Sequence, residues 1–217
     1  MVKVCGMRDA ENIRQIDELG CVDWMGFIFW PHSSRYVDER PSYLPEHAKR
    51  VGVFVNEDPG RILQIAADYQ LDFIQLHGHE SPEYVRSLMK QLSMRSLSHS
   101  GEPVGAIKAF NIATADDLKQ TEVYEGIVDY FLFDTKGKMV GGNGEKFDWD
   151  VLQAYKGNTP FILSGGIGPD DAERLKTVNC QLSAVNCIGI DLNSRFEIAP
   201  ALKDVNRILE FVKIFKS

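Results

Sequence analysis

The chain has few cysteines, and their spacing does not suit a metal site. Its 217 residues include four cysteines, at positions 5, 21, 180 and 187, and no two of them form a CxxC or CxxxC pattern. A zinc site or a thioredoxin-type redox motif is therefore not indicated. A framework of disulfide bonds is not expected either.

Long hydrophobic runs are missing as well. The longest apolar stretches reach about seven residues, whereas a helix that crosses a bilayer needs about 20. The first residues lack the basic segment and apolar core of a signal peptide. We therefore expect a cytoplasmic protein with no membrane partner.

Positive charge is also in short supply. The chain has 24 Lys and Arg against 31 Asp and Glu, a formal net charge of −7, and no basic stripe. This balance argues against general nucleic-acid binding, although a few cations or helix N-termini are enough to bind a small anion. No linker rich in Pro, Gly or Ser divides the chain, so we expect residues 1–217 to form one domain.

What the sequence does contain is a regular series of short apolar runs. They begin 22 to 31 residues apart and cover residues 2–4, 24–30, 51–55, 73–76, 104–110, 130–133, 161–163 and 187–192. That spacing fits a strand, a loop and a helix, and continuous apolar runs are typical of parallel strands buried on both faces.

Helix signals lie between several of these runs. Asp58-Pro59 and Ser81-Pro82 each combine a capping residue with a first-turn proline, and apolar residues follow at helical spacing. Residues 115–124 form the weakest helix candidate, because the segment is short and acidic. Eight βα units in one chain predict an α/β fold, a single-domain (β/α)8 TIM barrel. An open doubly wound sheet is the alternative.

Two chemically complementary residues end strands of this predicted barrel. Cys5 follows the first run and Asp134 follows the sixth. Barrel active sites lie at the carboxyl ends of the strands, so the two side chains should meet at one mouth. A thiolate that takes a proton and a carboxyl that gives one suit an isomerisation. A buried structural cysteine is the alternative for Cys5.

Two further strand ends favour binding of an anion. Residues 164–169 place Gly165 and Gly166 between the seventh strand and a helix, where backbone N–H groups approach a phosphate closely. Residues 191–195 follow the eighth strand, the other usual position of a phosphate site in barrels. A tight turn without a ligand is the alternative for the glycines.

The remaining candidates are open to two interpretations each. Arg35, after the second strand, is placed to bind a substrate carboxylate through its guanidinium fork or to form a surface ion pair. His77, at the fourth strand's end, is better explained as a hydrogen-bonded structural residue. Residues 135–148 are rich in glycine and form either a loop that closes over the substrate or a disordered surface loop.

Taken in order, the motifs resemble one family closely. They are Lys3-Val4-Cys5-Gly6, Gly26-Phe27-Ile28-Phe29, Ser34-Arg35-Tyr36-Val37, residues 51–56, Gln75-Leu76-His77-Gly78, Leu132-Phe133-Asp134, Gly141-Gly142-Asn143-Gly144, Phe147-Asp148-Trp149 and residues 163–167. Together they are similar to phosphoribosylanthranilate isomerase, the (β/α)8 barrel of tryptophan biosynthesis. The resemblance covers almost the whole chain.

The resemblance implies an Amadori rearrangement of N-(5-phosphoribosyl)anthranilate to 1-(2-carboxyphenylamino)-1-deoxyribulose 5-phosphate, without a metal or other cofactor. Cys5 matches the family's general base and Asp134 its general acid. Arg35 matches the arginine that binds the anthranilate carboxylate. The remaining matches are a strand-eight aspartate and the phosphate-binding backbone, at Asp191, Gly165, Gly166, Asn193 and Ser194.

The chain departs from the family pattern after the eighth strand. Residues 193–197 read Asn-Ser-Arg-Phe-Glu where the family usually has a serine-glycine pair. This puts the phosphate contacts of that loop in doubt, and Arg195 is a candidate to supply a charge there instead.

Three other functions compete with this interpretation. The sugar isomerase of histidine biosynthesis catalyses the same rearrangement, but it has an aspartate where this chain has Cys5. Another phosphate-binding barrel would need a metal cluster or a Schiff-base lysine, for which only Lys108 is a candidate. The third is a non-catalytic barrel. We expect a small phosphoribosyl substrate and a monomer or homodimer.

Overall fold

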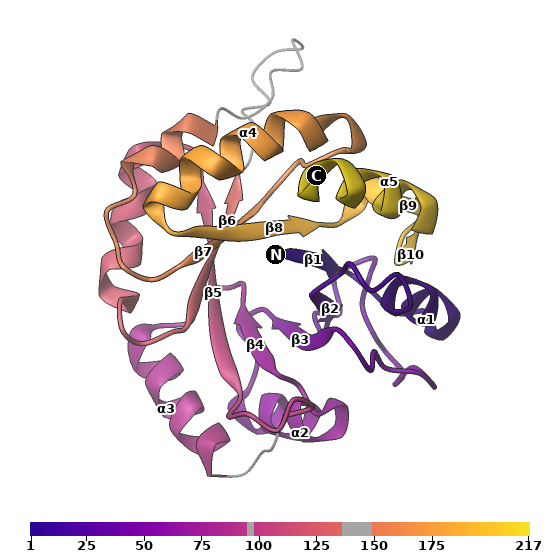
Figure 1. Ribbon diagram of the computed structural model, residues 1–217. Coiled ribbons are helices and arrows are strands. Elements are labelled where there is room, and N and C mark those ends of the chain that lie inside the picture. Colours follow the sequence, from indigo (N-terminus) through magenta and orange to yellow (C-terminus); the bar gives the residue numbers. More distant parts are fainter. Residues whose placement is uncertain (95–97, 136–148) are drawn as a thin grey trace.

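Eight parallel strands close into a barrel in the computed structural model, which describes residues 1–94, 98–135 and 149–217. The strands are β1 (Val2–Cys5), β2 (Trp24–Ile28), β3 (Lys49–Phe54), β4 (Phe73–Leu76), β5 (Gly105–Ile112), β6 (Tyr130–Thr135), β7 (Phe161–Ser164) and β8 (Cys187–Leu192). β8 pairs in parallel with β1, placing Ile190 opposite Val2, and this pairing closes the sheet (Figure 1). The predicted barrel is confirmed, and the open sheet is excluded.

The predicted strands agree closely with the observed ones. β4 and β8 have the expected bounds, and the others differ by one or two residues at one or both ends. Short apolar runs separated by the length of one crossover were therefore sufficient to locate every strand of the barrel.

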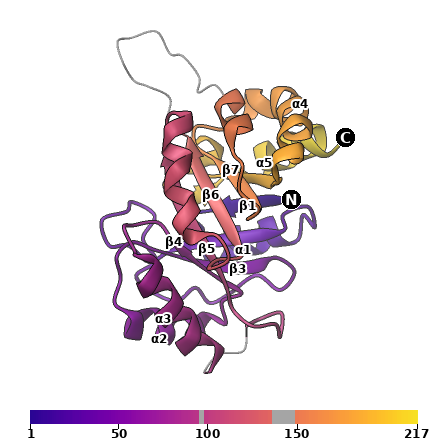
Figure 2. The same cartoon turned by 90° about the vertical axis from the view of Figure 1, so that its left-hand side faces the viewer.

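Among the residues described, five α-helices cover the outside of the barrel: α1 (Ala10–Asp17), α2 (Pro59–Tyr69), α3 (Pro82–Ser93), α4 (Ala172–Leu182) and α5 (Val205–Lys216). The predicted caps are present, since Asp58 accepts from Gly60 N at 2.8 Å and Ser81 from Tyr84 N at 3.2 Å. Figure 2 shows α2 and α3 together at one side of the barrel and α4 and α5 together at another. None of the helices described is long and apolar enough to cross a membrane.

The outer ring is less regular than eight complete βα units. Residues 29–48, between β2 and β3, contain no helix, and their three prolines remove backbone donors that a helix would use. β5 is followed by a 3-10 helix, η1 (Ala115–Tyr124), and β7 is preceded by another, η2 (Trp149–Ala154). The expectation of an α-helix in every unit is therefore wrong at these places.

Alternation along the strands divides the side chains between two cores. One set faces the helices, and the other fills the barrel's interior, where it comprises Trp24, Val51, Phe73, Ile107, Ala109, Leu132 and Ile162. Trp24 and Phe73 stack with ring centroids 4.4 Å apart, and Tyr130 packs edge-on against Trp24. This apolar plug fills the barrel below its mouth.

Candidate active site

A polar cavity of about 220 Å³ opens at the carboxyl ends of the strands. Its lining comprises Cys5, Ile28, Val53, Gln75, His77, Asp134, Ser164, Gly165, Gly166, Ile167, Asp191, Asn193 and Ser194. The structure therefore brings together all but one of the residues predicted for the site from the sequence. The exception is Arg35, which does not line the cavity.

Two glycines set the position of Cys5. Gly6, at φ +78°, turns the chain out of β1 and donates its amide to Gly26 O at 2.9 Å. A Cβ at Gly26 would lie 2.7 Å from Cys5 Sγ, so only glycine leaves room for the thiol there. The sulfur is consequently held against the wall between β1 and β2.

A buried ion pair lies beside the thiol and was not predicted. Lys3 shares the inner face of β1 with Cys5, two residues away, and its Nζ contacts Asp191 Oδ1 at 2.9 Å. The Lys3 side chain is fully buried and that of Asp191 is 6% exposed. Asp191 Oδ2 also accepts a hydrogen bond from Ser164 Oγ at 3.3 Å. Three strands thus contribute to one polar network beside Cys5.

The charges around Cys5 act on its ionisation in opposite directions. Burial raises the pKa of the Cys5 thiol above its usual range, and Asp191 raises it further, whereas the cations Lys3 and Lys203 lower it. Burial alone would lower the pKa of Lys3, but Asp191 and Cys5 leave it raised. Lys3 therefore remains an ammonium ion and favours the thiolate.

On the opposite wall, Asp134 faces a histidine. His77 Nε2 lies 3.7 Å from Asp134 Oδ2, and His77 Nδ1 is 3.3 Å from the side-chain amide nitrogen of Gln75. Gln75 is 1% exposed, and its Oε1 has no hydrogen-bond partner among the residues described. His77 therefore belongs to the site, where the sequence had favoured a purely structural role.

The glycine loop after β7 packs directly on the wall that carries Asp134. Gly165 has φ +97°, and a Cβ there would lie 2.8 Å from Asp134 Oδ1. Gly166 also has a positive φ, +65°. Arg195, from the loop that departs from the family pattern, lies over this segment, because its Cδ is 3.0 Å from the position of a Cβ at Gly168. A cation thus lies beside Gly168, two residues after Gly166.

Arg35 is engaged by a carboxylate of the chain itself. Its Nε and Nη2 donate to the two carboxylate oxygens of Glu197 at 2.7 and 2.6 Å. Lys203 Nζ contacts Glu197 Oε1 at 2.7 Å and Asn193 Oδ1 at 2.8 Å. Neither Glu197 nor Lys203 was predicted from the sequence, since both follow β8 in a small hairpin of β9 (Glu197–Ala199) and β10 (Leu202–Lys203).

Lys108 has a structural role. Its Nζ donates to the carbonyl oxygens of Leu76, Gly78 and Ala109 at 2.8–3.3 Å and contacts Glu80 Oε2 at 3.3 Å. It does not line the cavity. The predicted loop at residues 135–148 falls, from residue 136 on, outside the residues described.

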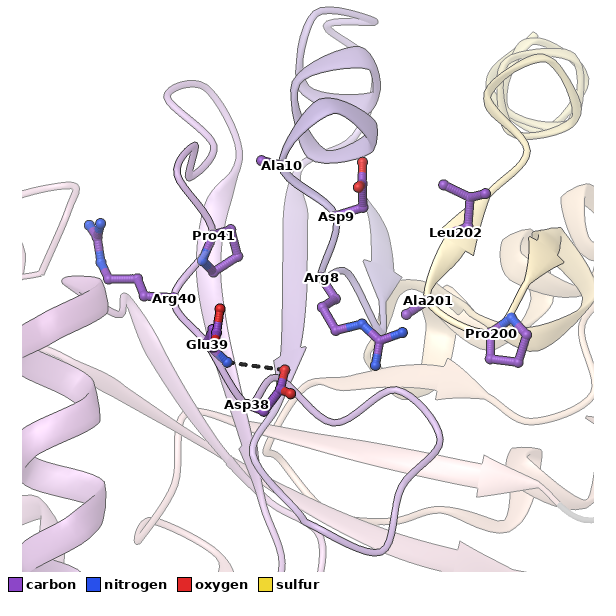
Figure 3. A pocket seen from close by; sticks show the side chains of 10 residues that line it. All are labelled: Arg8, Asp9, Ala10, Asp38, Glu39, Arg40, Pro41, Pro200, Ala201 and Leu202. Carbon is purple, nitrogen blue, oxygen red and sulfur yellow. Dashed lines mark hydrogen bonds between the residues drawn. The ribbon is translucent and has the colours of Figure 1, made fainter.

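Wider grooves lie on the outside of the barrel. The one in Figure 3, about 450 Å³, runs between the start of α1 and the loop at residues 38–41 and reaches Leu202. Several of its polar side chains already have partners: Arg8 donates to Tyr36 O, and Asp9 caps α1 through Asn12 N. Chemistry rather than size therefore identifies the strand-end cavity as the candidate site.

Fold and site together define a (β/α)8-barrel protein with a thiol, a carboxyl and glycine-rich turns around one polar cavity. The family model described as N-(5'phosphoribosyl)anthranilate (PRA) isomerase matches residues 2–214. The chain belongs to this family of isomerases of tryptophan biosynthesis. That membership decides between the two sugar isomerases considered from the sequence.

Relatives agree over the full length. The N-(5'-phosphoribosyl)anthranilate isomerase of Phocaeicola vulgatus is 49% identical and covers 100% of this chain and 98% of its own. The N-(5'-phosphoribosyl)anthranilate isomerase of Parabacteroides distasonis is 44% identical, and the match covers 98% of this chain and 92% of that protein. The solved phosphoribosyl anthranilate isomerase of Thermotoga maritima is 31% identical with a TM-score of 0.76, covering 99% of this chain and 98% of that one.

A second solved structure is informative about ligands. It is a phosphoribosyl anthranilate isomerase in complex with reduced 1-(o-carboxyphenylamino)-1-deoxyribulose 5-phosphate, 29% identical to this chain with a TM-score of 0.74. It covers 99% of this chain and 97% of its own. This relative binds a phosphorylated sugar that carries a carboxyphenylamino group.

Proposed function

We propose that this chain converts N-(5'-phosphoribosyl)anthranilate to 1-(2-carboxyphenylamino)-1-deoxyribulose 5-phosphate, with Asp134 as general acid and Cys5 as general base. The observation that carries these roles is that one cavity is lined by both side chains, which come from strands far apart in the sequence. The reaction is an internal redox exchange, in which C1′ is reduced and C2′ is oxidised.

The first step opens the sugar ring. Asp134 gives its proton to the ring oxygen, the bond between that oxygen and C1′ breaks, and the anilino nitrogen lone pair forms an iminium bond to C1′. Positioned proton transfer of this kind contributes about 10²- to 10⁴-fold to a rate. The ring nitrogen Nε2 of His77 lies 3.7 Å from the carboxylate that this step leaves behind.

The second step removes the C2′ proton. The iminium group makes that C–H acidic, and the Cys5 thiolate takes the proton while the electron pair forms an enolamine. Return of a proton to C1′ and loss of the 2′-hydroxyl proton give the ketone. Lys3 favours this base because its ammonium stabilises the thiolate.

Binding of the substrate's charged groups completes the proposal. The phosphate binds at the backbone of Gly165 and Gly166 and of the loop at Asn193 and Ser194, where Arg195 adds a positive charge. Arg35 takes the anthranilate carboxylate. Ile28, Val53 and Ile167 supply the apolar part of the cavity wall for the aromatic ring. Asp191 orients Lys3 beside Cys5.

A turnover assay tests the roles of the two proton-transfer residues. The fluorescence of the anthranilate-linked substrate should fall when the protein is added. Cys5→Ala and Asp134→Ala should each lower kcat by at least about 100-fold with unchanged far-ultraviolet circular dichroism. Cys21→Ala, at a free cysteine away from the cavity, serves as the matched control and should retain activity. Near-normal turnover in either test variant would refute the assignment.

We further propose that the 217 residues act as one domain in the cytoplasm, on a small phosphoribosyl substrate, as a monomer or a homodimer. One solved neighbour, 28% identical, consists of monomers generated from the dimeric Thermotoga maritima enzyme. Light scattering across a range of protein concentrations distinguishes the two states, and a stable higher oligomer would contradict both.

A further inference from the structure

A charged cluster lies at the rim of the cavity, and the mechanism above uses only one of its members. Glu197 contacts both Arg35 and Lys203 at 2.6–2.7 Å, and the side chains of Glu197 and Lys203 are 7% and 0% exposed. Burial would raise the pKa of Glu197, but the hydrogen bonds from Arg35 and Lys203 lower it overall. Buried ion pairs contribute little net stability because desolvation offsets their attraction. Stability is therefore a weak explanation for the cluster.

The contact leaves half of the Arg35 guanidinium available. Glu197 takes the edge formed by Nε and one N–H of Nη2. The opposite edge, formed by Nη1 and the second N–H of Nη2, matches a second carboxylate equally well. Within residues 1–94, 98–135 and 149–217, no acceptor is found for that edge. Glu197 thus fixes the plane of the guanidinium and leaves one fork open.

The cluster remains attractive to an anion. Burial lowers the pKa of Lys203, and its contact with Glu197 opposes that shift. With Lys203 as an ammonium ion, Arg35, Lys203 and Glu197 together carry one net positive charge. Without Lys203, the Arg35–Glu197 pair would be neutral and would bind a carboxylate less strongly. Lys203 therefore compensates for the charge of the residue that holds Arg35.

The cluster is also close to the reacting groups. A Cβ at Gly6 would lie 2.6 Å from Arg35 Cδ and 2.9 Å from Asn193 Oδ1. Gly6 directly follows Cys5, and Asn193 lines the cavity. Arg35 therefore packs against the turn that ends β1, next to the strand-eight loop.

We propose that Glu197 is a positioning residue, which holds Arg35 side-on so that its opposite edge receives the ring carboxylate of the substrate. This inference rests on the proposed function. It assigns to Glu197 the specificity for a carboxylated aromatic amine rather than a proton-transfer role.

The test compares two ligands on the intact protein. The first is the reduced product analogue with its 2-carboxyphenylamino group, and the second is the same molecule with an unsubstituted phenyl ring. The wild-type protein should bind the first roughly 10- to 100-fold more tightly, as expected for hydrogen bonds between charged groups. Arg35→Ala should reduce that ratio to about 1, and Glu197→Gln to about 3 or less.

Glu197→Gln is the sharpest variant because it removes the charge and one of the two acceptors while preserving the shape. In the native protein, Ala201 N donates a hydrogen bond to Glu197 Oε1 at 3.2 Å. The side-chain carbonyl oxygen of the glutamine can still accept this bond. For the substrate, KM should rise with little change in kcat. In the double variant Arg35→Ala/Glu197→Gln, the ratio of the two ligand affinities should equal that of Arg35→Ala alone, because Glu197 acts through Arg35. Glu57→Gln, which removes the partly exposed Arg61–Glu57 pair, is the matched control and should leave the ratio unchanged.

The possible outcomes separate this inference from the proposed function. If Glu197→Gln weakens both ligands equally, or lowers Tm without changing their ratio, Glu197 is only structural, and the positioning role is refuted while the enzyme assignment stands. If Arg35→Ala leaves the ratio unchanged, Arg35 is not the carboxylate's partner and the positioning role is refuted with it. Wild-type protein that does not turn over the substrate refutes the proposed function itself.

Discussion

Two buried lysines on the barrel strands differ in what surrounds them. Lys108, on β5, has three carbonyl oxygens and the Glu80 carboxylate within 3.3 Å of its Nζ. Lys3, on β1, interacts through hydrogen bonds with two side chains, the Asp191 carboxylate and the cavity thiol of Cys5. An ammonium group has three N–H donors. Lys108 is therefore saturated, whereas Lys3, with two partners, keeps one N–H donor for a substrate.

The difference follows from the face of the strand on which each lysine lies. Lys3 alternates with Val2 and Val4, which pack against the helices, so it points into the barrel. Lys108 lies between Ile107 and Ala109, which belong to the interior plug, so it points outward. Hydrogen-bond saturation thus distinguishes a lysine that anchors a loop from one that serves a reaction.

The largest expected effect is loss of stability in Lys108→Met. The substitution removes the cation from a buried pair with Glu80 and leaves three carbonyl oxygens without their donor. We expect the free energy of unfolding to fall by about 3–5 kcal/mol, with kcat of the folded fraction little changed. Urea unfolding and active-site titration measure the two quantities. Lys119→Met, which removes an exposed pair with Asp116, is the control and should cost less than about 1 kcal/mol.

The next effect is loss of turnover in Lys3→Met. Without the ammonium, burial and Asp191 both oppose the Cys5 thiolate, so kcat/KM should fall by about 100-fold. Lys3→Arg retains the charge and should recover part of the activity. Unchanged kcat/KM in Lys3→Met would place Lys3 in the same structural class as Lys108 and end the contrast.

The sequence alone did not separate these two lysines. The barrel strands are mostly apolar on both faces, so the sequence shows no regular alternation that marks which residues point inward. The strand ends, by contrast, are marked by abrupt changes of residue type, and this is why Cys5, Asp134 and the glycine turn were found.

Contacts across long sequence separations were also beyond prediction. Glu197 and Arg35 are 162 residues apart, and the sequence of neither segment predicts a contact with the other. The fold, by comparison, follows from local signals repeated eight times. The crossover at residues 29–48 was missed, because its prolines lie between two strands of normal spacing. The 3-10 helices η1 and η2 were missed as well, since they stand where α-helices were expected.

A smaller effect is a shift in the pH dependence of the reaction. The base must be a thiolate, so kcat/KM should rise with pH until Cys5 is ionised. Lys3 lowers the pKa of Cys5, and its removal therefore moves the rising limb to higher pH. Thiolate absorbance in the ultraviolet follows the same titration without substrate. Lys108→Met should leave the limb in place, and an equal shift in both variants would contradict the contrast.

The smallest effect is expected at Gln75, which extends the contrast to an uncharged residue. Gln75 is as buried as Lys108, but its Oε1 has no partner among the residues described and it lines the cavity, so unused hydrogen-bond capacity groups it with Lys3. Gln75→Leu should lower kcat/KM about 10-fold, the value of one or two hydrogen bonds. It should not lower the free energy of unfolding, because it removes a buried unpaired acceptor.

Nitrogen-15 shifts of the His77 ring should change in the same variant. The Gln75 amide donates to Nδ1 and thereby keeps the ring proton on Nε2, facing Asp134. A loss of stability with normal turnover would instead assign Gln75 to the anchoring class and show that saturation does not predict function here.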